Sequence, residues 1–81
     1  MRLDKFLKLS RVIKRRTVAA SAADAGRVSV NGRVVKPGHK LKVGDEILIE
    51  FGGSSLKIRV RELRENIRKE EADTLYEVID Q

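Results

Sequence analysis

The dipeptide Asn31-Gly32 is the sequence feature that most restricts the fold of this chain. It lies between two short runs with apolar character, VSV at 28–30 and RVV at 33–35. Asn-Gly readily adopts the two positive φ angles of a type I′ turn, and this turn joins antiparallel strands. These residues therefore predict a β-hairpin, and the rest of the chain has to build an antiparallel sheet around it.

Two helices are predicted ahead of this hairpin. Leu3, Phe6 and Leu7 recur at the i, i+3, i+4 spacing of one apolar helix face, and this helix is expected to end near residue 10. A second helix is predicted from about residue 15 to residue 25, since Gly26 supplies the left-handed residue that commonly follows a helix. The small residues expected on its apolar face are Val18, Ala19, Ala22 and Ala23.

The second half of the chain predicts further strands and a polar tail. Strands are expected at 46–51 and 56–61, joined by a turn at 52–55. The basic face of the later strand is expected to point to solvent; it consists of Lys57, Arg59 and Arg61. In the tail, a short helix or turn at 69–76 and a final strand at 76–79 are both open, with Leu75 and Tyr76 docking on the sheet. The pattern predicts an α+β fold with two short N-terminal helices packed on a small, twisted antiparallel sheet.

Length and composition limit the classes of protein to which the chain can belong. Its 81 residues give room for a single domain, with a motif core at about 2–51 and a C-terminal strand and tail at 56–81. The absence of Cys and the single His leave few ligands for a metal. No apolar run approaches the ~20 residues that span a bilayer. We expect a cytoplasmic protein without metal, cofactor or membrane contact, and no set of residues predicts an enzyme.

Positive charge is concentrated in the first half of the chain. Residues 1–44 contain 12 Lys or Arg and 2 acids, whereas residues 45–81 contain 6 and 10. A field of one sign predicts a polyanionic partner, and the low aromatic content favours recognition of RNA shape and phosphate over base stacking. The candidate RNA-binding residues are Arg2, Lys5, Lys8, Arg11, Lys14, Arg15, Arg16, Lys36 and Lys40.

Three further expectations concern this basic segment. Asp4 is expected to be a helix-start residue or the structural partner of a nearby arginine, and a salt bridge to Arg16 would fix the angle between the two helices. The N-termini of the helices are expected to offer free N–H groups to phosphate oxygens. His39 lies alone in a basic loop and is expected to be exposed.

The order of motifs resembles the S-four (αL motif) RNA-binding domain, a two-helix module first seen in a ribosomal small-subunit protein. RLDK, KRR before the second helix, and G-x-V-x-V-N-G carry the resemblance over residues 2 to about 51. The chain is similar to the stand-alone RqcP (YabO-like) class in its length, its SR and KRRT segments and its tail. The positions that match this class are Arg2, Asp4, Lys5, Arg11, Lys14 and Arg16. Many relatives carry Ser or Thr at the position of Arg15, so Thr17 or a backbone group is expected to cap the second helix here.

The resemblance implies a non-enzymatic adaptor of ribosome-associated quality control that works as a monomer. Its partners would be the rRNA of an obstructed large ribosomal subunit, the peptidyl-site tRNA and an RqcH-type factor that adds a C-terminal alanine tail to the stalled chain. Three alternatives stay open: a heat-shock-type recycling factor for large subunits, the RNA-binding subunit of a split RNA-modification enzyme, and a regulator that binds a protein through its acidic half.

Overall fold

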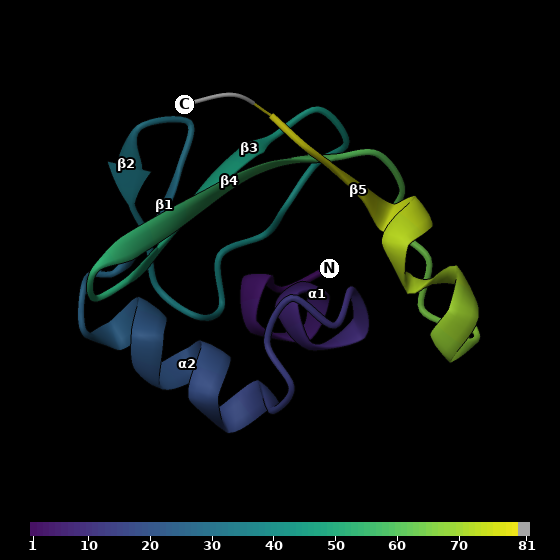
Figure 1. Ribbon diagram of the computed structural model, residues 1–81, viewed down its shortest axis with the longest axis horizontal. Helices are drawn as coiled ribbons and strands as arrows, with labels where there is room; N and C mark the ends of the chain where they lie inside the picture. The colour runs from purple at the N-terminus through teal and green to yellow at the C-terminus, as the bar shows by residue number, and fades with distance from the viewer. Residues whose placement is uncertain (80–81) are drawn as a thin grey trace.

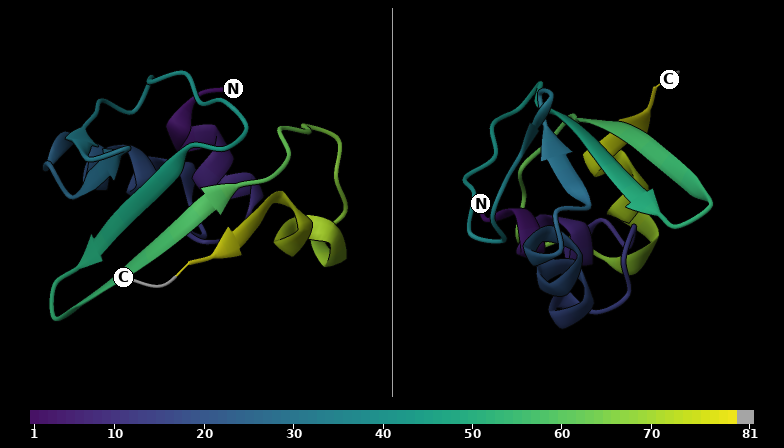
Figure 2. Two further views of the ribbon diagram at one scale, coloured as in Figure 1. Left: turned by 90° about the horizontal axis from the view of Figure 1, so that it is seen from above. Right: turned by 90° about the vertical axis from the view of Figure 1, so that its left-hand side faces the viewer.

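The computed structural model, which describes residues 1–79, has two layers (Figure 1). Helix α1 spans Leu3–Leu9 and helix α2 spans Arg16–Asp24, and both lie on one side of a five-stranded sheet. The longest hairpin of the sheet extends beyond the helices (Figure 2). The α+β architecture predicted from the sequence is confirmed.

The helices form where the apolar spacing predicts them. Leu3, Phe6 and Leu7 are completely buried and pack α1 against the core. Helix α2 packs through Ala19 and Ala23, four residues apart, whose small side chains let it lie close to α1. The expectation that Val18 belongs to this face is wrong. Its side chain lies one position outside the Ala19 and Ala23 row and is 50% exposed.

The sheet has the order β2-β1-β3-β4-β5, and each neighbouring pair is antiparallel. Its strands are β1 Val28–Val30, β2 Arg33–Val34, β3 Glu46–Phe51, β4 Ser54–Val60 and β5 Tyr76–Val78. Alternate residues of the central strands, among them Ile47, Ile49 and Ile58, face the helices and are completely buried. The sheet and the two helices therefore share one hydrophobic core.

Two turns define the hairpins. Asn31 (φ 51°) and Gly32 (φ 85°) connect β1 to β2, as the sequence predicts for a type I′ turn. The turn predicted at 52–55 is shorter than expected, because Phe51 pairs with Ser54 and β4 begins two residues early. Gly52 (φ 67°) supplies the positive φ angle that such a two-residue connection requires.

The tail returns to the sheet and completes it. A 3-10 helix, η1, spans Lys69–Leu75 and leads directly into β5, so both structures considered for this segment are present. Leu75 is completely buried, and its carbonyl oxygen accepts the backbone N–H of Arg61 at 2.8 Å. Tyr76 pairs with Val60 and packs against the core. The tail is thus held at the edge of the sheet next to β4, in the same domain as the basic first half of the chain.

Candidate nucleic-acid interface

The carboxylate of Asp4 holds two arginines, one just before α1 and one at the start of α2. Asp4 is 4% exposed at the start of α1. The guanidinium group of Arg2 donates two hydrogen bonds to it, each of 3.1 Å, and Nε of Arg16 lies 3.4 Å from Oδ2. The carboxylate also accepts the backbone N–H of Lys5 at 2.8 Å. Asp4 is therefore the structural partner that the sequence suggested, and it joins the starts of α1 and α2.

The two arginines are oriented without being buried. Their side chains keep about half of their surface exposed, 55% for Arg2 and 47% for Arg16. Burial alone would raise the pKa of the Asp4 carboxyl, but the hydrogen bonds from Arg2, Arg16 and the Lys5 backbone outweigh it and lower that pKa. Asp4 is thus ionised at neutral pH. The remaining N–H groups of both guanidinium groups face solvent and can bind an anion bidentately.

The basic loop at 36–40 is hydrogen-bonded to the beginning of α1. The N–H of Leu3 donates to the carbonyl of His39 at 2.8 Å, and the N–H of Asp4 donates to the carbonyl of Pro37 at 3.1 Å. A bridge also pairs Arg2 with Lys40. These bonds place two predicted binding residues, Lys36 and Lys40, beside the Asp4 cluster. His39, expected to be exposed, is partly buried in this loop because its carbonyl is tied to α1.

The two helix N-termini differ in what they can offer an anion. The loop carbonyls and the Asp4 side chain take the first N–H groups of α1, so the expectation of free amides there is wrong. No side chain of the described residues caps α2, at Arg15 or elsewhere, so the cap expected from Thr17 is absent. The first turn of α2 therefore keeps amides that are open to an anion, next to Arg16.

The other predicted binding residues fall into two groups. Lys5 forms an ion pair with Glu65 of the tail, which lowers the pKa of that glutamate. The exposed cations Lys8, Arg11, Lys14 and Arg15 lie between the middle of α1 and the start of α2. Within residues 1–79 none of these four takes part in an ion pair. The connection between the helices therefore carries four unpaired positive charges within eight residues.

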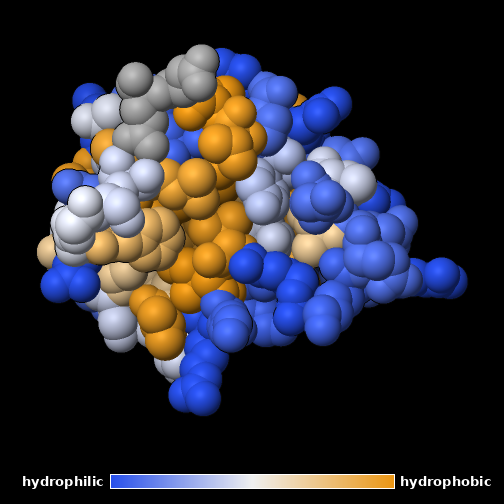
Figure 3. Space-filling model, in the orientation of Figure 1, coloured by the Kyte–Doolittle hydropathy of each residue, from blue (hydrophilic) through white to orange (hydrophobic). Residues whose placement is uncertain are grey.

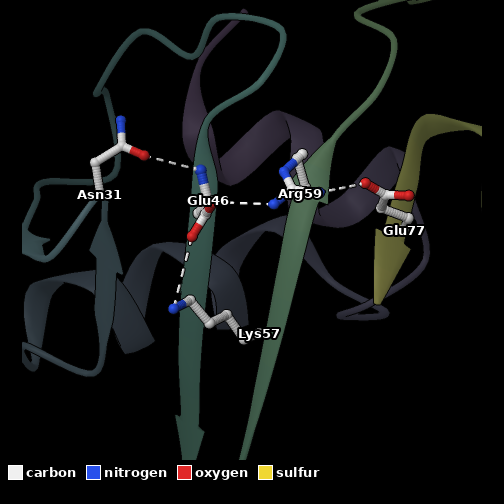
Figure 4. Close-up of polar contacts among 5 residues, drawn as sticks. All are labelled: Asn31, Glu46, Lys57, Arg59 and Glu77. Carbon is white, nitrogen blue, oxygen red and sulfur yellow. Dashed lines mark hydrogen bonds and ion pairs between the residues drawn. The ribbon is translucent and has the colours of Figure 1, made fainter. Parts of the chain in front are cut away.

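The basic face of β4 is neutralised by acids on the neighbouring strands (Figure 4). Glu46 of β3 lies 3.6 Å from Lys57 and 3.1 Å from Arg59, and Arg59 also contacts Glu77 of β5 at 2.6 Å. The bond from Arg59 is the main cause of a lowered pKa at Glu46. Lys57, Arg59 and Arg61 all lie on the solvent face of the sheet, as expected, but the first two have their charges paired with acids. The pairs leave the outer face of the sheet a poor site for RNA.

Sequence reasoning missed two cations of the tail. Arg68 and Lys69 stand in an acid-rich stretch that looked like a solvated segment, but the fold brings them next to Lys8 and Arg11. The one local signal was a basic pair in the middle of acids, RK at 68–69. In the described part of the chain no group of His, Cys, Asp or Glu side chains could hold a metal ion. No helix among residues 1–79 has the length and apolar character to cross a membrane.

Known proteins resemble this chain both in sequence and in fold. The S4 domain family matches residues 1–47. The "RQC P-site tRNA stabilizing factor" of Halalkalibacterium halodurans is 54% identical over 78 residues, which cover 96% of this chain and 89% of that protein. The protein of the same description from Bacillus subtilis is 48% identical, with 98% and 92% covered. A solved structure of Vibrio cholerae heat shock protein 15, described as trimeric, superimposes with a TM-score of 0.89 at 30% identity, over 98% of this chain and 81% of that one.

Proposed function

Because the chain belongs to the S4 domain family and, within it, to the family of RQC P-site tRNA stabilizing factors, we propose that it binds RNA on the large ribosomal subunit and stabilises peptidyl-site tRNA there. It does so in ribosome-associated quality control, as a binding factor and not as an enzyme. The rRNA of the subunit and the tRNA are its direct partners. An RqcH-type tailing factor benefits from the tRNA that is held in place.

The observation that carries this proposal is the pair of arginines on Asp4. Phosphate groups are recognised best by guanidinium groups whose planar fork is already oriented, because little side-chain entropy is then lost on binding. Arg2 and Arg16 meet this condition: one buried carboxylate holds both, and both remain about half exposed.

The distribution of the other charges supports an extended RNA contact. The unpaired cations of the α1–α2 connection and the loop residues Lys36 and Lys40 lie in the same half of the chain as the arginine pair, whereas ten of the twelve acids belong to residues 45–81, which form strands of the sheet and the tail. Each phosphate that such a surface neutralises releases condensed counterions, so binding should weaken steeply with salt. Five to seven phosphate contacts imply a loss of about a hundredfold or more between low and physiological salt.

Sedimentation tests the proposal directly. Tagged protein from a lysate should migrate with large ribosomal subunits that carry tRNA, and Arg16→Ala should move it toward the top of the gradient. Arg61→Ala is the matched control, because Arg61 is exposed and has no ion pair among the described residues. Wild-type protein that stays at the top of the gradient would refute the proposal.

A second candidate is the heat-shock-type recycling function, which the similarity to the Vibrio structure favours. The two functions differ in their dependence on tRNA. A tRNA-stabilising factor should bind purified large subunits more tightly when the peptidyl site holds tRNA, whereas equal binding to empty subunits would favour recycling. We propose that the cytoplasmic protein acts as a monomer, and a sedimented mass of three chains would contradict this.

A further inference from the structure

A narrow groove lies between the end of α1 and the beginning of η1. Its volume is about 110 Å³, enough to hold more than one water molecule. The residues that line it are Lys8, Leu9, Arg11, Ile67, Arg68 and Lys69. Four cations from segments almost 60 residues apart in sequence thus surround two aliphatic side chains. We propose that this groove binds a backbone phosphate of RNA, which extends the interface at the two helices onto the tail; the inference rests on the proposed function.

The charges of this groove are not compensated by the protein. Within residues 1–79 none of its four cations forms an ion pair, although the tail is rich in acids. Three of those acids have other cationic partners: Glu65 pairs with Lys5, while Glu62 and Glu71 contact Arg64. Glu71 also accepts the backbone N–H of Arg68 at 3.0 Å, which leaves the guanidinium group of Arg68 without an acidic partner among the described residues. Like charges around one small groove repel one another, so a bound anion relieves an unfavourable arrangement.

The backbone of Arg11 supplies independent support. Arg11 directly follows the C-cap of α1 and has φ 63°, in the left-handed region that favours glycine. Its N–H donates to the carbonyl of Lys8 at 3.0 Å, as glycine would do at this position. Bulky residues in such conformations cluster at functional sites, where the surrounding structure holds them in place. Here the arginine side chain lines the groove.

The tail wall of the groove is fixed in advance. The ion pair between Lys5 and Glu65 attaches the tail to α1 just before the groove. Leu63 and Ile67 pack against the core, and Leu75 is completely buried after it. The surface around η1 is hydrophilic in the space-filling view (Figure 3). A phosphate would therefore meet cations on two anchored segments, and little ordering would oppose its binding.

The experiment compares two double variants with the same change in charge. Arg68→Ala with Lys69→Ala removes the tail side of the groove, and Lys57→Ala with Arg61→Ala removes two cations from β4 and its end. Binding to large ribosomal subunits with peptidyl-site tRNA is measured at several salt concentrations. We expect the groove variant to bind about tenfold more weakly, with a salt slope reduced by about 1–2, and the control to change binding less than twofold.

The outcomes separate this inference from the function on which it rests. Wild-type protein that binds no subunits at any salt overturns the proposed function and the groove with it. Normal wild-type binding with an unchanged affinity and slope in the groove variant overturns the groove alone. A photocrosslinking residue in place of Lys69 should give a ribonuclease-sensitive product, and a product with ribosomal protein alone would overturn the assignment to RNA.

Arg11→Gly provides a test in which folding and binding change in opposite directions. Glycine relieves the positive φ angle, so the melting temperature should stay the same or rise. Subunit affinity should nevertheless fall several-fold, because one of the four cations is lost. Unchanged affinity in this folded variant would contradict the use of the Arg11 side chain.

Discussion

Asp4→Ala should destabilise the fold more than the loss of a small side chain suggests. The carboxylate accepts two hydrogen bonds of 3.1 Å from Arg2 and one of 2.8 Å from the Lys5 backbone, and it pairs with Arg16 at 3.4 Å. Hydrogen bonds to a charged group contribute about 1.5–3 kcal/mol each, but water replaces part of this at the half-exposed arginines. We therefore expect a loss of about 2–3 kcal/mol of unfolding free energy. At about 4–8 °C per kcal/mol for a domain of this size, the melting temperature should fall by about 8–24 °C.

Thermal unfolding followed by circular dichroism at pH 7 measures this change. Asp24→Ala is the matched control, since Asp24 is exposed and ends α2, where a carboxylate meets the negative end of the helix dipole. The control should stay within about 0.5 kcal/mol of the wild type. Equal melting temperatures for the two variants would refute the role of Asp4 as the joint between the helices.

The pH dependence of the same contribution has a defined sign. Burial raises the pKa of Asp4, but the hydrogen bonds from Arg2, Arg16 and the Lys5 backbone lower it by more, so the pKa lies below its ordinary value of 3.8. Since the folded-state pKa is the lower one, the stabilisation is complete above the unfolded value and is lost as the pH falls through the folded pKa. The difference in melting temperature between wild type and Asp4→Asn should be constant from pH 7 to about 5 and shrink below pH 4. A difference that stays constant down to pH 2 would contradict this.

Three further predictions concern binding, the core and a turn. Arg16→Ala should weaken subunit binding by about 1–3 kcal/mol and lower the unfolding free energy by at most ~1 kcal/mol. Arg16→Lys should recover only part of the affinity. If melting temperature and binding fall in parallel, Arg16 has a purely structural role. Leu7→Ala should lower the unfolding free energy by about 2–5 kcal/mol because Leu7 is completely buried, whereas Lys8→Ala should change it by less than ~0.5 kcal/mol. Equal melting shifts for the two variants would contradict the assignment of Leu7 to the buried face of α1. Gly32→Ala should cost about 1–2 kcal/mol because φ is 85°, while Gly53→Ala should be neutral, since Gly53 has no positive φ and an added Cβ meets nothing within 4 Å.

The sequence alone determined the features that depend on neighbouring residues. The Asn31-Gly32 turn, the left-handed Gly26 after α2 and the buried stripe of α1 are all present as predicted. Each of them follows from the φ preference of one residue or from apolar spacing within one helical turn. The concentration of positive charge ahead of residue 45 was also visible without a structure. Together these local signals were sufficient for the α+β fold.

Only the tertiary structure decided which charges are free. Lys5 and Lys8 look alike in the sequence, but Lys5 pairs with Glu65, whereas Lys8 lines an open groove with Arg68. Lys57 faces solvent as expected, but its charge is paired with Glu46 of the neighbouring strand, which the sequence did not indicate. These outcomes depend on strand order and on the return of the tail, which bring together residues up to 60 positions apart. A charged side chain has no strong local preference for one distant partner over another, so its pairing is set by the packing of the apolar core that positions the backbone beneath it.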